Sequence, residues 1–312
     1  MRNVTLSGIQ PPNARDGSTV GERKADNIRI AFSMMAETVK RGADLICLPE
    51  TFQVTGLGSS KETARQLADE EGGELSQKLC AFARKNHVDL IAPVLGRYGT
   101  TLRNVAWGIS RDGEHIGRYF KVHCTQGETD KGVVPGEEWP ILEFGFGRVG
   151  VMICHDNSWP ESARCLALNG AEVVCWPHVQ SGWGEIVWDI TLRSRAVDNA
   201  VYLLSACYGV PDGTAWQPGL MMGRTGIVGP DGTVLVDAGR IATIVSSTVD
   251  LDSPVLRHSF SEKGTRDYRA RMFADRRPET YAPLTQPKQK LSHEHIARTS
   301  PPLASSGQEI RR

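Results

Sequence analysis

Residues 150–161 read GVMICHDNSWPE, and this stretch joins an apolar run to a cysteine and then to a polar turn. The apolar run ends at Cys154, and Pro160 stands where a following helix would begin, because proline is favoured in the first helical turn. The stretch therefore predicts a buried strand, a turn that presents a thiol, and a helix from about residue 160 to 169.

The same alternation of apolar runs and amphipathic stretches continues on both sides of this turn. Strands are predicted at 3–9, 43–49, 88–96, 104–110, 148–154, 172–176 and 200–206, and further helices at 22–40, 74–86 and 187–199. The turn sequence GPDGT at 229–233 lies between two apolar runs and predicts a hairpin, so we also expect antiparallel pairs. This alternation indicates a layered α/β domain.

Composition narrows the classes of partner. The 312 residues include 36 Lys and Arg and 36 Asp and Glu, so a net charge of zero gives no support to a nucleic-acid or membrane partner. No stretch approaches the roughly 20 apolar residues of a membrane helix, and the first residues lack the apolar core of a secretion signal. Seven scattered cysteines without a CxxC pair argue against a disulfide framework and a structural zinc site. We therefore expect a soluble, cytoplasmic protein.

Three predicted strand ends share one pattern, in which an apolar run stops at an ionisable residue. DLICLPET presents Glu50, GRYFKVH presents Lys121, and GVMICHD presents Cys154. Ligand sites of open α/β sheets lie beyond the carboxyl ends of their strands, so these three side chains can converge on one pocket.

A carboxylate, an ammonium and a thiol make a chemically coherent set. A thiol attacks only as its thiolate, so Glu50 could accept the proton while Lys121 stabilises the thiolate and the oxyanion formed on attack. Such a set would perform acyl transfer without metal or cofactor. Taken singly, each residue also has an ordinary reading: Cys154 as a core thiol, Glu50 as a helix-start carboxylate and Lys121 as a solvated lysine. The three together favour the chemical reading.

These motifs resemble those of a known family. LPETF at 48–52, YFKVH at 119–123 and GVMICHDNSWPE at 150–161 resemble the Glu, Lys and Cys motifs of the nitrilase superfamily of carbon–nitrogen hydrolases, in the same order. RRPETY at 276–281 is similar to a late segment of several amidase-like members.

The resemblance implies a fold and an assembly. It implies an α/β fold, the four-layer α-β-β-α sandwich of the nitrilase superfamily, whose protomers pair through their helices into a homodimer or a larger homo-oligomer. The hydrolase domain would span 1–284, with 254–284 reaching across the dimer. Residues 285–312 are polar and would form a flexible tail.

The resemblance also implies roles for individual residues. Glu50 would be the general base, Lys121 the stabiliser of the oxyanion, and Cys154 the nucleophile. Many members carry a second glutamate seven or eight residues beyond the lysine, which matches Glu128, although a loop carboxylate is the alternative reading.

The residues after the cysteine discriminate among substrates. Nitrilases usually follow the cysteine with Trp-Glu, whereas this chain has His155 and Asp156, so CHDNSWPE is closer to the amidase and carbamoyl-hydrolase branches. In hydrolases of D-carbamoyl amino acids, two arginines occupy the positions of Asn157 and Ser158, and their absence removes a carboxylate clamp. We expect Asp156 to organise the turn.

Further residues are candidates for contact with the substrate. His155 follows the cysteine, and the loop CWPHVQSGWGEIVW at 175–188 carries Trp176, His178 and Trp183. His178 could equally be a loop histidine bonded to the backbone. Arg195 would be the first choice for an anionic substrate group, although pairing at a helix surface is the simpler reading.

Three functions follow from this sequence. The leading one is hydrolysis of a small amide or carbamoyl compound through a covalent acyl-enzyme, which releases ammonia or an amine. The second is a nitrilase that acts on a C≡N group. The third is a catalytically silent binding or scaffold subunit.

Overall fold

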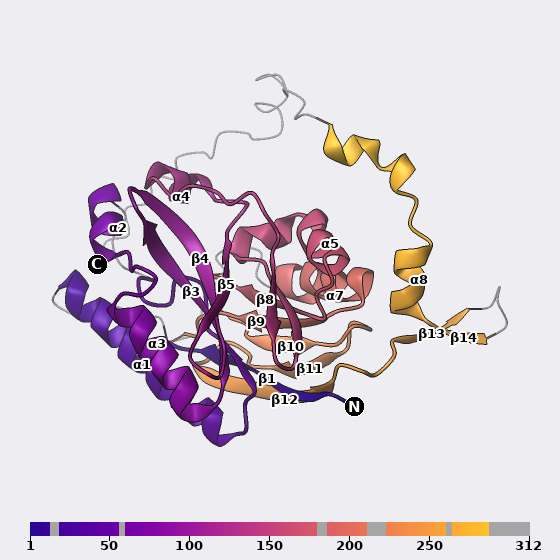
Figure 1. Cartoon of the computed structure of the whole chain (residues 1–312), viewed down its shortest axis with the longest axis horizontal. Coiled ribbons are helices and arrows are strands. Elements are labelled where there is room, and N and C mark those ends of the chain that lie inside the picture. The colour runs from indigo at the N-terminus through magenta and orange to yellow at the C-terminus, as the bar shows by residue number, and fades with distance from the viewer. Residues whose placement is uncertain (13–18, 56–59, 180–185, 211–222, 260–263, 287–312) are drawn as a thin grey trace, which may run out of the picture. The chain divides into compact units, whose positions relative to one another are not determined.

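The computed structural model describes residues 1–12, 19–55, 60–179, 186–210, 223–259 and 264–286. Two six-stranded sheets form its centre, in the orders β12-β1-β2-β3-β4-β5 and β11-β10-β9-β8-β7-β6 (Figure 1). The first sheet contains β1 (Asn3–Gln10), β2 (Leu45–Cys47), β3 (Asp89–Tyr98), β4 (Thr101–Ile109), β5 (His115–Phe120) and β12 (Thr243–Asp250). The second contains β6 (Ile141–Phe144), β7 (Gly147–Val151), β8 (Val173–Pro177), β9 (Tyr202–Ala206), β10 (Gly226–Val228) and β11 (Val234–Asp237).

Helices cover the outer face of each sheet. On the first sheet, α1 (Val20–Lys40) and α3 (Glu74–Asn86) bury apolar side chains such as Met35 and Leu79 in one cluster with Trp107. On the second sheet, α5 (Pro160–Leu168) and α7 (Arg193–Asn199) pack their apolar faces in the same way. Two short helices, α2 (Lys61–Leu67) and α4 (Gln126–Asp130), lie in the connections.

A third cluster of buried side chains lies between the two sheets. It joins residues of the first sheet, such as Leu6 and Ile91, to residues of the second, such as Val151 and Leu204, all fully buried. Each buried aliphatic side chain contributes about 1.5–3 kcal/mol, so this layer holds the sheets together. The order of layers is helix, sheet, sheet, helix, which confirms the predicted sandwich.

Strand direction decides where the site can form. In the first sheet β2 pairs parallel with β3, and β5 also runs with β3 because each is antiparallel to β4. The carboxyl ends of β2 and β5 therefore meet at one edge. In the second sheet β7, β8 and β9 are parallel, so their carboxyl ends also share an edge.

Most predicted elements are present, but several boundaries differ. The predicted helix at 74–86 is α3, and the predicted hairpin is the antiparallel pair of β10 and β11. The strand expected at 148–154 ends at Val151, and Cys154 begins a 3₁₀ turn that runs to Ser158. The helix expected at 187–199 starts with a π-helical turn over Val187–Leu192.

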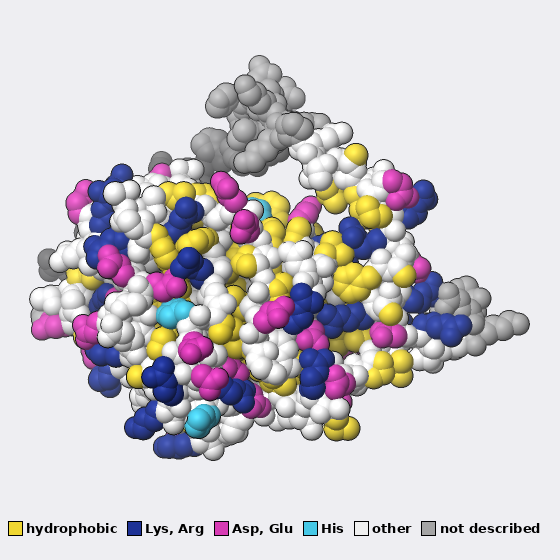
Figure 2. Space-filling model, viewed as in Figure 1, with side chains coloured by type: hydrophobic (Ala, Val, Ile, Leu, Met, Phe, Trp, Pro, Cys, Tyr) yellow, Lys and Arg dark blue, Asp and Glu magenta, His cyan; other side chains and the backbone are white. Residues whose placement is uncertain are grey.

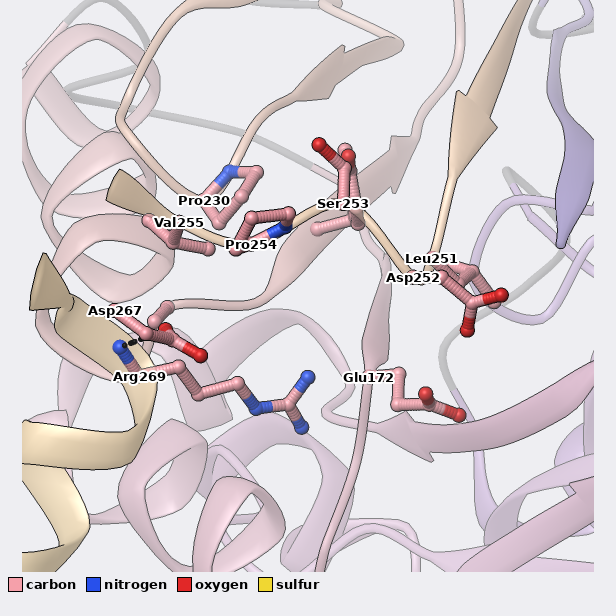
Figure 3. A pocket seen from close by; sticks show the side chains of 11 residues that line it. Glu172, Pro230, Leu251, Asp252, Ser253, Pro254, Val255, Asp267 and Arg269 are labelled. Atoms are coloured by element: carbon pink, nitrogen blue, oxygen red, sulfur yellow. Dashed lines mark hydrogen bonds between the residues drawn. The ribbon is translucent and has the colours of Figure 1, made fainter. Parts of the chain in front are cut away.

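The chain divides into two compact units, Met1–Phe273 and Ala274–Arg312. The first unit closes with β13 (Leu256–Ser259), β14 (Gly264–Asp267) and the beginning of α8 (Tyr268–Ala274). Arg269 points into a cavity of about 160 Å³ toward Glu172, and its guanidinium donates to the Ala171 carbonyl at 2.7 Å (Figure 3). This contact holds the beginning of α8 against the end of α5's connection to β8. The crossing of residues 254–284 to a partner subunit stays a prediction.

The visible surface carries both signs of charge. Lysine and arginine side chains alternate with aspartate and glutamate over the face shown in Figure 2, with no large region of a single sign. Within the described residues, no helix is both long and apolar enough to cross a membrane.

Candidate active site

Glu50 stands three residues beyond the end of β2 and is 5% exposed. Its Oε1 accepts hydrogen bonds from Lys121 Nζ and Asn104 Nδ2, both at 2.8 Å. Its Oε2 accepts from the Val179 N–H at 3.0 Å, and its carbonyl accepts from the Tyr208 hydroxyl at 3.0 Å. These contacts fix the carboxylate at the edge where the carboxyl ends of the strands meet.

Lys121 directly follows β5 and is 1% exposed. Its Nζ lies 2.8 Å from both Glu50 Oε1 and Glu128 Oε2, so one ammonium bridges two carboxylates. Burial alone lowers the pKa of Lys121, but the neighbouring negative charges, that of Glu50 foremost, outweigh burial and raise it. The side chain therefore stays an ammonium.

Glu128 occupies the first turn of α4. Thr125 caps this helix, and its backbone N–H and hydroxyl donate to Glu128 Oε2 at 2.8 and 3.0 Å. Burial tends to raise the pKa of Glu128, but Lys121 and the hydrogen bond from Asn104 outweigh this, so the pKa lies below its usual range. The structure thus brings the second glutamate into one polar cluster with Glu50 and Lys121.

Cys154 lies three residues beyond β7, in the turn between that strand and α5. Its φ is +45°, a left-handed conformation that costs a non-glycine residue about 1–2 kcal/mol. Its carbonyl accepts from the Trp176 indole N–H at 3.0 Å, and its Sγ lies 3.6 Å from the Val179 carbonyl. A strained turn held from behind by a tryptophan therefore presents this half-buried thiol.

The groups around Cys154 have opposing effects on the pKa of its thiol. Burial raises the pKa of the thiol well above its usual range, Glu50 raises it further, and Lys121 lowers it. The resting thiol is therefore protonated at neutral pH and needs a base before it can attack. Val179 links the two groups, since its N–H donates to Glu50 while its carbonyl lies beside Cys154 Sγ.

The residues predicted to contact the substrate differ in solvent exposure. Trp176 and His178 are buried and stacked with ring centroids 3.7 Å apart, and His178 Nε2 lies 2.9 Å from Ser205 Oγ. Burial lowers the pKa of His178 to about 3, so its ring is neutral. His155 is half-buried and packs edge-on against Trp159, which leaves it the most accessible of these candidates.

Arg195 does not lie among the polar groups of the site. The guanidinium of Arg195 is buried and donates to the Asn157 carbonyl at 3.1 Å, and burial lowers its pKa. It supports the turn after Cys154 from behind. Trp183 lies outside the described residues.

Asn104 is the residue that sequence reasoning missed. It lies on β4, is 3% exposed, and its Nδ2 donates to Glu50 Oε1 at 2.8 Å and to Glu128 Oε1 at 2.7 Å. The only signal in the sequence is a polar residue in the otherwise apolar run NVAWGI. Asn104 and Lys121 together bridge the two carboxylates.

We expect Asn104→Leu to weaken turnover without abolishing it. A hydrogen bond to a charged group is worth about 1.5–3 kcal/mol, which corresponds to a roughly 10- to 100-fold fall in kcat/KM. Steady-state kinetics on any hydrolysed amide measures this fall. Asn199→Leu is the matched control, because Asn199 is equally buried but donates to the Arg195 carbonyl, outside the cluster. Equal kinetics for the two variants would contradict a role for Asn104.

Among the residues that the structure describes, no group of three His, Cys, Asp or Glu side chains could hold a metal ion. The groups that meet here are a base, a cation and a thiol. This set can perform covalent chemistry at a carbonyl carbon.

Comparisons with known proteins identify the family. Residues 4–254 match the family model described as carbon-nitrogen hydrolase. The omega-amidase NIT2 of Homo sapiens is 29% identical over 239 residues, which cover 73% of this chain and 84% of that protein.

Solved structures agree in fold. The structure of Saccharomyces cerevisiae Nit3, a member of branch 10 of the nitrilase superfamily, matches with a TM-score of 0.68 and 25% identity over 80% of this chain and 90% of that one. An amidase from Nesterenkonia sp. matches with a TM-score of 0.68 and 22% identity over 90% of this chain and 95% of that one. In that structure, of a mutant, the acetamide moiety of fluoroacetamide is covalently added at the active-site cysteine. The chain described here therefore belongs to the carbon–nitrogen hydrolase family of the nitrilase superfamily and is an enzyme of that family.

Proposed function

We propose that the enzyme hydrolyses the C–N bond of a small linear amide or carbamoyl compound through an acyl-enzyme on Cys154. The observation that carries this proposal is the convergence of Glu50 and Lys121 from one sheet with Cys154 from the other. The backbone N–H of Val179 contacts the Glu50 carboxylate, and the backbone carbonyl of Val179 contacts the thiol. An amide is favoured over a nitrile because His155 and Asp156 replace the Trp-Glu pair usual in nitrilases.

The acylation step uses the groups that the two sheets bring together in this cluster. Glu50 accepts the thiol proton, and the sulfur attacks the carbonyl carbon. Lys121 and the backbone N–H of His155 stabilise the oxyanion that forms, and preorganised donors of this kind are worth about 3 kcal/mol each. The C–N bond breaks as the proton held by Glu50 passes to the leaving nitrogen, so ammonia or an amine departs.

Deacylation uses the same residues in the same roles, with water as the nucleophile and the thiolate as the leaving group. Glu50 takes a proton from water, the hydroxide attacks the thioester carbon, and the C–S bond breaks to release the acid and the thiol. Glu128 holds the Lys121 ammonium in place through the contact at 2.8 Å. All proton transfers are thus carried by one carboxylate.

A substrate panel tests the function. Ammonia release is measured on terminal amides, carbamoyl compounds and nitriles, with wild-type protein and with Cys154→Ala as the blank. Terminal amides are included because the human relative is named an omega-amidase. Consumption of nitriles with no action on amides would replace the amidase with a nitrilase. Failure of the whole panel, together with an unreactive Cys154, would favour a silent binding subunit.

Chelation should leave this activity unchanged. The described residues offer no metal-ligand cluster, and the proposed steps need only protein groups. Prolonged EDTA treatment should therefore preserve ammonia release, whereas iodoacetamide should abolish it with modification at Cys154. Loss of activity after chelation, followed by recovery on adding zinc, would contradict the proposed steps.

A further inference from the structure

Asp156 lies two residues after Cys154 and is fully buried. Its Oδ2 accepts hydrogen bonds from the Tyr119 hydroxyl and the Ile153 N–H, both at 2.7 Å. Its Oδ1 lies 2.9 Å from both the backbone nitrogen and the Nδ1 of His123. A carboxylate has about four acceptor positions, and here each oxygen meets two donors.

The donors belong to two segments of the site. Tyr119 and His123 stand two residues before and two residues after Lys121, and Ile153 directly precedes Cys154. A single carboxylate therefore joins the strand end that carries the ammonium to the turn that carries the thiol. The strand end belongs to the first sheet and the turn follows a strand of the second.

The contacts are directional and enclosed. Burial, followed by the negative charge of Asp156, raises the pKa of Tyr119 well above its usual range, so its hydroxyl keeps the proton that it donates. The same hydroxyl accepts from the Val122 N–H at 3.2 Å, which extends the contact along the Lys121 segment. The His123 ring is stacked on Trp159 with centroids 4.1 Å apart, so it too is held in place.

A buried carboxylate is costly unless hydrogen bonds satisfy it. Its four donors offset that cost here, but an apolar residue would fill the same space without needing any of them. The left-handed turn at Cys154 adds strain that the surrounding contacts must hold. A buried carboxylate is worth these costs if it fixes the position of the Lys121 segment relative to the Cys154 turn.

We propose that Asp156 is a positioning residue, which sets the separation of the Lys121 ammonium from the Cys154 sulfur. The inference rests on the proposed function only in that the two groups cooperate in acylation. Asp156 acts through Lys121 and Cys154.

Asp156→Asn is the first test. The Asn amide nitrogen would face two donors, so the Lys121 segment should move away from the turn. A displacement of about 1 Å can cost about 10²-fold in rate, and we expect that fall in kcat with KM changed by less than about threefold. The thiol should also titrate at higher pH in iodoacetamide alkylation, because the Lys121 charge withdraws. Removal of a negative charge alone would shift that titration downward, so the sign separates the two effects.

Asp89→Asn is the matched control. Asp89 is 1% exposed, accepts from the Arg111 backbone N–H at 2.6 Å and binds its guanidinium at 2.8 Å, at the beginning of β3. This variant should lower the melting temperature but leave kcat and the Cys154 titration at their wild-type values. Equal behaviour of the two variants would reduce Asp156 to general structural support and overturn the proposal.

His123 supplies a test that keeps the Asp156 carboxylate. His123→Ala removes one donor and should lower kcat and raise the alkylation pH, while His123→Asn places an amide N–H near the position of Nδ1 and should restore both. Wild-type kcat and titration in His123→Ala and Asp156→Asn would overturn the positioning role while leaving amide hydrolysis intact. Alkylation needs no substrate, so a wild type that hydrolyses no amide would contradict the proposed function alone.

Discussion

Cys154→Ala is expected to show no amide hydrolysis above the background rate, a fall on the order of 10⁴-fold or more, while the protein stays folded. The thiol is the protein's nucleophile in the proposed acylation step, and the hydrogen bonds between Glu50 and Lys121 do not depend on it. Ammonia release, measured on protein free of wild-type enzyme, checks the rate. Circular dichroism checks the fold.

Two further variants test whether the loss of activity is specific to the Cys154 thiol. Cys154→Ser should also be inactive, because the Glu50 base is placed for a thiol and a hydroxyl is far harder to deprotonate. Cys80→Ala is the control, since Cys80 is another half-buried free thiol but lies on α3. It should keep full activity, and a Cys154→Ala enzyme that retained most of its rate would remove the thiol from the mechanism.

Lys121→Met should lower kcat by at least about 10²-fold, because the oxyanion loses an electrostatic contact worth about 3 kcal/mol or more. The variant should also raise the pKa of Cys154, since Lys121 is the cation that opposes the effects of burial and Glu50. The pH dependence of iodoacetamide alkylation measures this shift. A thiol that titrates as in the wild type would leave Lys121 without an electrostatic part in activating Cys154.

Glu50→Gln separates the base from the cation. It should slow both acylation and deacylation, because a Gln amide cannot accept a proton. Its effect on the thiol has the opposite sign, since the negative charge of Glu50 raises the pKa of Cys154 and its removal lowers that pKa.

Lys24→Met is the control for the Lys121→Met variant. Lys24 also pairs with a carboxylate, that of Asp69 at 2.8 Å, so loss of an ion pair alone is matched.

The sequence predicts the layers of the fold better than the ends of its elements. The apolar run at 148–154 predicts a longer strand than β7, which ends at Val151, because Met152 and Ile153 are as buried as Val149 and Val151. Hydropathy reports burial and cannot distinguish a buried loop from a strand. The β12 strand, TIVSSTVD, escaped prediction because its polar residues face hydroxyls on β1, such as Ser246 beside Ser7 at 2.8 Å.

The site was predictable where local sequence carries the signal. Glu50, Lys121 and Cys154 each end an apolar run, so their convergence could be expected, whereas Glu128 was indicated only by the resemblance to the nitrilase superfamily. The contacts of Asn104 and Asp156 could not, because each depends on side chains 24 or more residues away that only the folded sheets bring near. A local sequence pattern therefore indicates which residues belong to the site, whereas the hydrogen bonds that hold them in place depend on tertiary contacts.

The reactive centre forms only when the two sheets pack against each other. The ammonium and the carboxylates come from the first sheet and the connections around it, whereas the thiol follows a strand of the second, so neither sheet alone contains a working set. During synthesis the chain completes Glu50 and Lys121 before Cys154 emerges. A partly folded chain, in which the two sheets have not closed on each other, would therefore carry the cysteine without its base, so activity appears only when both sheets are in place.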